Sequence, residues 1–152
     1  MAIAETEQVS ATKLWATFFL RDALCAIDAA GVQEVIRLGS VTPVRHAPDE
    51  VTGVINLRGK IVTLLDTGKI LGFGKAATSR DSRIFIVEDR NEFLGLLVDH
   101  VGEVLEIEPG RQEPIPGNIP ALQAHYFSGV YRANGRVIAL LNPATLLAES
   151  KA

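Results

Sequence analysis

The stretch GVINLRGKIVTLLD, residues 53–66, decides the fold, because it recurs as GVYRANGRVIALLN at residues 129–142. Five positions are identical in the two copies, and four more carry similar side chains. Each copy holds two apolar runs around a glycine-bearing turn, Arg58-Gly59 in the first and Asn134-Gly135 in the second. Asn-Gly between apolar runs is a strong hairpin signal, because a type I′ turn needs positive φ at both central residues. The repeat therefore predicts two strand hairpins.

A second pair of matching segments lies upstream of each copy. VQEVI at residues 32–36 aligns with VGEVL at residues 101–105, and apolar runs typical of a hairpin precede both, at 14–27 and 84–98. The type of 32–38 stays open at this point, because it alternates like a strand while Asp28 predicts a short helix from 29 to about 33. Each half is then a unit of about five short strands and roughly 70 residues, which buries a marginal core alone. We expect two small β-barrels packed through one apolar layer, with a groove between them.

The same patterns suggest how the chain is divided. Residues 1–13 are polar and predict a loose tail, and residues 14–148 predict a single domain. The first barrel is expected mainly within 14–80 and the second mainly within 81–148, with strands crossing between them. The small, polar segment 71–82 predicts a connector, and four prolines between 109 and 120 predict a long loop. Pro143 followed by helix-forming residues predicts a short terminal helix.

Composition and charge exclude several classes of protein. The 152 residues include 15 Lys+Arg and 18 Asp+Glu, a net charge of −3, which argues against a nucleic-acid binder. A single cysteine, Cys25, excludes an internal disulfide and a zinc site built on several thiolates. No apolar run has the roughly 18 residues that a membrane helix needs, and the N-terminus lacks the pattern of a secretion signal. We expect a cytoplasmic protein without direct membrane insertion.

Residues that could support catalysis or hold a metal are scattered. The three histidines are far apart and have no companion ligands at a useful spacing, so we expect neither a metal nor a cofactor; they are His46, His100 and His125. Cys25 lies in an apolar run and is expected to be a buried, inert thiol. Three aspartates each end an apolar run and are expected to cap turns or helices: Asp28, Asp66 and Asp99. An enzymatic activity has no residues to support it, and we expect none.

The segment GVINLRG, residues 53–59, combined with GLLVDHVGEV at 95–104, resembles the CheW family, the coupling proteins of bacterial chemotaxis. Further matching segments appear in family order over residues 14–148: AID at 26–28, VQEV at 32–35, AP at 47–48, LD at 65–66 and LLN at 140–142. The resemblance implies a mainly β, CheW-like fold of two intertwined, five-stranded, SH3-like barrels with short helices. It also implies a non-enzymatic adaptor. Thr63 and the pair Cys25-Ala26 depart from the common family pattern.

The resemblance implies two protein partners and a set of contact residues. The partners are the regulatory domain of a CheA-type histidine kinase and the cytoplasmic tip of a methyl-accepting chemoreceptor. The receptor tip is expected in the groove between the barrels, at the positions that match the family's receptor-facing residues: Val32, Glu34, Gly53, Arg58, Gly95 and Val101. The two glycines are expected to admit a helix closely, because they lack a side chain.

One contact can be stated as a hypothesis at this stage. Arg58 is a turn arginine without an acidic sequence neighbour, and we expect it to pair with Glu34 across the rim of the groove. Two alternative functions remain open. One is a CheW-like adaptor of a non-flagellar chemosensory pathway, which controls pili, development or a second messenger. The other is a double barrel that binds a small molecule.

Overall fold

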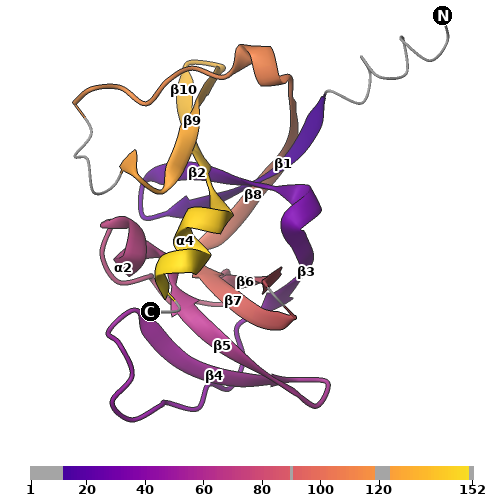
Figure 1. The fold of residues 1–152 in the computed structure, drawn as a ribbon, viewed down its shortest axis with the longest axis vertical. Helices are drawn as coiled ribbons and strands as arrows, with labels where there is room; N and C mark the ends of the chain where they lie inside the picture. The colour runs from indigo at the N-terminus through magenta and orange to yellow at the C-terminus, as the bar shows by residue number, and fades with distance from the viewer. Residues whose placement is uncertain (1–11, 90, 119–123, 151–152) are drawn as a thin grey trace, which may run out of the picture.

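The computed structural model describes residues 12–89, 91–118 and 124–150. Ten strands and several short helices follow one another along this part of the chain (Figure 1). Their order is β1 (Lys13–Leu20), β2 (Ala23–Asp28), η1 (Ala29–Gly31), β3 (Val32–Arg37), β4 (Val51–Leu57), β5 (Lys60–Asp66), α2 (Thr67–Leu71), β6 (Arg83–Asp89), β7 (Glu92–Val98), β8 (His100–Ile107), η2 (Pro109–Arg111), β9 (Phe127–Ala133), β10 (Arg136–Leu141) and α4 (Pro143–Ser150). Residues 32–37 are therefore a strand, and the helix that Asp28 caps is a single short turn. Most of the expected tail, 1–13, lies outside the described residues.

The strands form two five-stranded sheets. The upper sheet in Figure 1 has the order β8-β1-β2-β10-β9, and the lower sheet has the order β3-β6-β7-β5-β4. In the upper sheet the edge strand β8 pairs with hairpin β1–β2, and β2 runs parallel to β10 of hairpin β9–β10. In the lower sheet the edge strand β3 pairs with hairpin β6–β7, and β7 runs parallel to β5 of hairpin β4–β5. The two sheets therefore share one topology, as the sequence repeat predicts, and the mainly β fold class is confirmed.

The two halves of the sequence exchange their leading hairpins. Hairpin β1–β2 lies in the upper sheet with β8, β9 and β10, whereas hairpin β6–β7 lies in the lower sheet with β3, β4 and β5. The lower sheet takes its strands from residues 32–98, and the upper sheet takes its strands from residues 13–28 and 100–141. Parallel pairing joins β2 to β10 and β5 to β7. Such pairs need long connections, so local sequence patterns do not specify them.

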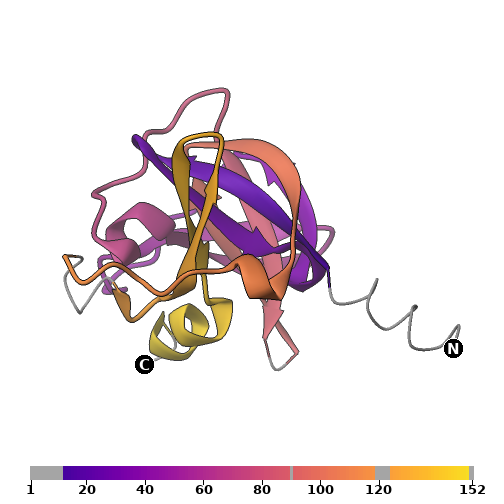
Figure 2. The same ribbon diagram turned by 90° about the horizontal axis from the view of Figure 1, so that it is seen from above.

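An apolar layer between the sheets holds the molecule together. It includes Phe18 and Ile27 from the upper sheet and Phe85 and Leu96 from the lower sheet, all nearly inaccessible to solvent. The rings of Phe18 and Phe85 meet edge to face, with centroids 5.4 Å apart. Each sheet also curves around a smaller apolar cluster of its own. Figure 2, turned by 90°, shows α4 lying beside the strands rather than between them.

Gly53 and Gly129, the first residues of the two repeat copies, have the same structural role. A single bridge residue pairs with the strand beside each glycine, Thr42 with Val54 and Glu113 with Val130. A Cβ atom on Gly53 would lie 2.4 Å from the carbonyl oxygen of Thr42, and one on Gly129 would lie 2.7 Å from that of Glu113. Both glycines are therefore required by the close approach of a bridging backbone segment.

Two buried aspartates attach the connector 71–82 to the lower sheet. Asp66 ends β5 and accepts the backbone N–H of Lys69 and of Ala76, each at 3.1 Å. Asp99 follows β7 and accepts the N–H of the next connector residue, Ala77, at 3.1 Å. The expectation that these residues cap turns and helices is confirmed. Among the described residues, no helix is long and apolar enough to cross a membrane.

Candidate partner-binding site

Four valines at equivalent repeat positions lie on the edge strands β3 and β8, two on each strand. We call Val32, Val35, Val101 and Val104 the valine stripe. Val35, Val101 and Val104 are 45%, 38% and 59% exposed, and Val32 is half-buried against the apolar layer. Val35 lies opposite Phe85, and Val101 lies opposite Phe18. Because cross-strand neighbours share a face, the stripe carries the apolar layer between the sheets out to solvent.

A β-bulge in each edge strand turns a glutamate away from this stripe. In β3, Val32 pairs with Val87 but Glu34 pairs with the adjacent Ile86, so one extra residue is inserted. The register of β8 against β1 shifts at the equivalent place. A bulge re-aims the side chains around it. Glu34 consequently shares a face with Ile86, on the inner side of the lower sheet, and not with the valines.

Glu34 meets Arg58 in a two-point ion pair. Arg58 Nη1 donates to Glu34 Oε1 at 3.2 Å, and Nη2 donates to Oε2. The β4–β5 turn positions Arg58, with φ of 50° at Arg58 and 86° at Gly59, and the side chain of Asn56 accepts the N–H of Gly59 at 2.9 Å. The predicted contact between Glu34 and Arg58 is thus confirmed. A guanidinium bound through two nitrogens has a fixed orientation.

The pair is open to solvent but electrostatically coupled. The side chain of Arg58 is 70% exposed and that of Glu34 is 30% exposed. The hydrogen bond from Arg58 lowers the pKa of the Glu34 carboxyl, and the same bond raises the pKa of Arg58. Exposed pairs contribute little to folding. The pair is therefore better suited to orienting a charged group toward a partner than to stabilising the fold.

The remaining two predicted residues, Gly53 and Gly95, face the protein's own interior. Gly53 accommodates the bridge to Thr42, as described above. Gly95 lies buried in β7, where a Cβ atom would come within 2.8 Å of Ile84 Cγ2 and 3.2 Å of Leu64 Cδ1. Internal packing therefore already excludes a side chain at both positions.

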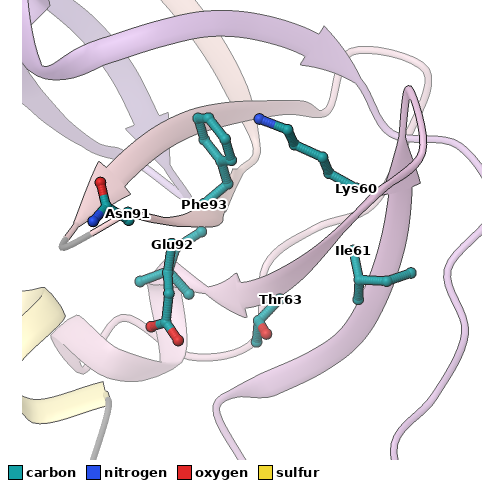
Figure 3. Close-up of a pocket in the computed structure, with 7 residues that line it drawn as sticks. Lys60, Ile61, Thr63, Asn91, Glu92 and Phe93 are labelled. Carbon is teal, nitrogen blue, oxygen red and sulfur yellow. The ribbon is translucent and has the colours of Figure 1, made fainter.

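Two adjoining pockets lie on the lower sheet, and the ion pair lines one of them. The first, of about 300 Å³, is lined by Glu34, Leu57, Arg58, Lys60 and Phe93, among others. The second, of about 380 Å³, shares Lys60 and Phe93 with it and continues over Ile61 and Asn91 (Figure 3). Lys60 Nζ lies 4.4 Å from the centroid of the Phe93 ring, a cation–π contact that holds the lysine over the pocket.

Cys25 and the possible metal-ligating side chains were the candidates for chemistry in the sequence. Cys25 is fully buried, and burial raises its pKa to about 12, so the thiol is uncharged and inert at neutral pH. No three His, Cys, Asp or Glu side chains gather into a metal-binding group within the part of the chain that the structure describes. The features that the site does offer are an apolar stripe, an oriented charge pair and shallow pockets, which together suit the binding of another protein.

Sequence reasoning missed two residues of this surface, Val35 and Val104. Both are more exposed than Val101, which was predicted. The signal was present in the sequence, because the aligned segments at 32–36 and 101–105 place a valine at both positions. Only the register of the bulged edge strands shows that these valines lie on the same face as Val32 and Val101.

Known proteins resemble the chain in both sequence and structure. The family model for the CheW-like domain matches residues 15–151. The chemotaxis protein CheW of Rhizobium meliloti is 30% identical over 82% of this chain and 80% of its own. Protein FrzA of Myxococcus xanthus is 29% identical over 88% of this chain and 84% of its own.

The fold has a matching solved structure. The crystal structure of the scaffolding protein TtCheW from Thermoanaerobacter tengcongensis superimposes with a TM-score of 0.78 at 35% identity, covering 86% of this chain and 84% of that one. The paired five-stranded sheets described above are therefore an arrangement that this scaffolding protein shares. With the family match across nearly the whole length, these likenesses show that the chain belongs to the CheW family.

Proposed function

We propose that this chain is a non-enzymatic adaptor that couples methyl-accepting chemoreceptors to a CheA-type histidine kinase. The observation that carries the proposal is the exposed valine stripe on β3 and β8 together with the Glu34–Arg58 pair, which lies on the opposite face of the same edge strand β3. The chain acts through binding alone. By holding both partners in a fixed geometry, it lets the state of the receptor bias the population of active kinase.

The receptor side uses the valine stripe. The cytoplasmic tip of a chemoreceptor is a helical hairpin, and an amphipathic helix recognises a groove through apolar residues spaced along one face. The four valines supply the complementary apolar contacts from both sheets. Glu34 and Arg58 select the register and orientation of the helix at the rim, while Gly53 and Gly95 hold the underlying backbone.

The kinase side uses a barrel-to-barrel contact. The regulatory domain of a CheA-type kinase has the same kind of fold, so the two proteins can meet through equivalent surfaces of their sheets. This contact is separate from the valine stripe, which leaves the chain able to bind both partners together. The complex then assembles in the cytoplasm, at arrays of membrane-anchored receptors.

A second candidate is an adaptor of a non-flagellar chemosensory pathway. The similarity to FrzA is as extensive as the similarity to CheW of Rhizobium meliloti, at 29% against 30% identity. Both candidates require the same two kinds of contact. They differ in which kinase and receptor of the same genome bind, so binding measured against each candidate pair distinguishes them.

The test of the proposed function measures binding of each partner separately by isothermal titration calorimetry. The partners are a receptor-tip fragment and the kinase regulatory domain from the same genome. We expect Arg58→Glu and Glu34→Arg each to weaken receptor binding and to leave kinase binding unchanged. The double exchange should recover part of the receptor affinity if the pair acts as a unit.

Two matched controls separate these effects from general damage. Arg80→Glu makes the same charge reversal in the exposed connector, away from the stripe. Val137→Asp is compared with Val104→Asp, because Val137 is also exposed, at 44%, but lies outside the stripe. Receptor binding that is equally weakened by Val104→Asp and Val137→Asp, or that survives both, would contradict the assignment of the valine stripe.

A further inference from the structure

The upper sheet has a pocket at the position equivalent to the Glu34–Arg58 site of the lower sheet. This upper pocket has a volume of about 290 Å³ and is lined in part by Glu103, Asn134 and Arg136. The sequence repeat aligns Glu103 with Glu34, Asn134 with Arg58 and Arg136 with Lys60. The β-bulges that aim the two glutamates also lie at equivalent positions. The two pockets are therefore repeat copies of one site.

One cation is retained in both copies. Lys60 Nζ lies over the ring of Phe93 at 4.4 Å, and the guanidinium carbon of Arg136 lies over the ring of Phe19 at 5.3 Å. Both cations are thus held by an aromatic ring at the wall of their pocket. In neither copy does this cation form an ion pair with the glutamate among the described residues.

The second cation is present in one copy only. In the lower pocket Arg58 binds both oxygens of Glu34, whereas the turn residue of the upper pocket is Asn134. The backbones of the two turns are alike, with φ of 50° and 86° at Arg58 and Gly59 and 52° and 77° at Asn134 and Gly135. The side chain of Glu103 has no hydrogen-bond or ion-pair partner among residues 12–89, 91–118 and 124–150.

The floor of the upper pocket suits the stem of a long side chain. Leu24, Leu105 and Ile138 line the pocket and also belong to, or pack against, the apolar cluster of the upper sheet. The volume of about 290 Å³ lies just below the range for small-molecule sites, roughly 300–1,000 Å³. A long basic side chain fits such a site, because it buries its methylene stem and keeps its charged end at the rim.

We propose that the upper pocket receives an arginine side chain from a partner protein, whose guanidinium pairs with Glu103 as Arg58 pairs with Glu34. The negative carboxylate without a partner, the apolar floor and the missing turn arginine all indicate this one occupant. The inference rests on the proposed function for the identity of the partner. It adds to that function a docking point outside the valine stripe.

The first test needs no partner protein. Uniformly labelled wild-type protein is titrated with acetyl-arginine-amide, and with acetyl-citrulline-amide as an uncharged control of the same shape, while amide NMR shifts are recorded. We expect saturable shifts for residues 102–105 and 134–138 with the arginine compound only. Glu103→Gln and Asn134→Arg should abolish them, the first by removing the charge and the second by filling the pocket from within. Absence of such shifts in the wild type would overturn the proposal.

The second test uses the two candidate partners. Because Glu103 and Asn134 are exposed, Asn134→Arg and Glu103→Gln should weaken binding of one of them by about two- to fivefold, as expected for loss of an exposed charge pair. Asn134→Gln, a long uncharged substitution at the same turn position, is the matched control and should bind as wild type does. If wild type binds neither partner, the proposed function fails while the arginine titration still decides the pocket. If both partners bind all three variants equally, the arginine pocket is refuted.

Discussion

Replacement of Gly53 by alanine tests the structural role assigned to the repeat glycines. The added methyl group would lie 2.4 Å from the carbonyl oxygen of Thr42 and 2.7 Å from Val41 Cγ1. Neither contact is tolerated, so β4 has to move away from residue 42. Two backbone hydrogen bonds then lengthen or break, Thr42 N to Val54 O at 2.9 Å and Val54 N to Thr42 O at 2.8 Å.

The magnitude follows from these contacts. Two backbone hydrogen bonds contribute a net of about 1–3 kcal/mol to the free energy of unfolding. If the hydrogen bonds persist and the added methyl group is accommodated by shifts of the surrounding atoms, the overpacking costs a similar amount, about 1–3 kcal/mol. Alanine restricts the unfolded chain and so offsets about 0.4–1 kcal/mol of this loss. We expect Gly53→Ala to lower the free energy of unfolding by roughly 1–2 kcal/mol. At about 2–4 °C for each kcal/mol, Tm falls by about 2–8 °C.

Thermal unfolding followed by circular dichroism, with urea titrations at 25 °C, measures this effect. Gly39→Ala is the matched control, because a Cβ atom there meets nothing within 4 Å. Gly129→Ala should destabilise in the same direction but by less, since its closest contact is 2.7 Å to Glu113 O. If Gly53→Ala and Gly39→Ala have the same free energy of unfolding, the close approach of residue 42 does not require a glycine at position 53, and the reasoning is refuted.

Carbon-detected NMR titration should give Glu34 a pKa below its ordinary value, and Arg58→Gln should raise it. A lowered folded-state pKa stabilises the fold at higher pH, and this small contribution is lost as the pH falls through that pKa; an unchanged pKa in the variant would contradict the pair. Asp66→Ala should accelerate amide hydrogen exchange at Ala76 well beyond its effect on global unfolding, because the buried carboxylate accepts that N–H at 3.1 Å; equal effects would argue against the attachment. Cys25 should resist a thiol reagent in the folded protein and react on unfolding, since it is buried with a pKa of about 12; rapid labelling without denaturant would show an open core.

Local sequence patterns were sufficient for most of the strands and for one contact of the site, but they did not predict α2 (Thr67–Leu71) and left the type of 32–38 open. The residue pairs Arg58-Gly59 and Asn134-Gly135 predicted hairpin turns, and all four residues have the positive φ that such turns require. Glu34 and Arg58 were expected to pair, and they do. Both results depend on residues whose conformational or charge preferences act over a short distance. Hairpin turns, and an ion pair that involves a charge without a sequence neighbour of opposite sign, can therefore be predicted from the sequence.

The exchange of hairpins between the sheets was not specified by these patterns. Pairing of β2 with β10 joins Cys25 to Ala139, residues that no turn brings together. The apolar residues of β1 and β6 would be buried equally well in either sheet, so the periodicity of the sequence does not select the strand with which each one pairs. The internal packing around Gly53 and Gly95 was also not predicted, because the atoms next to their Cβ positions come from other segments and from core side chains.

The most direct test of the account is whether the chain binds receptor and kinase at the same time. The receptor-tip fragment is titrated into the chain alone and into the chain saturated with the kinase regulatory domain, and the stoichiometry and affinity are compared by calorimetry. Adaptor function predicts one ternary complex, with similar receptor affinity in both titrations and loss of that affinity in Val104→Asp. Mutually exclusive binding of the two partners would contradict it.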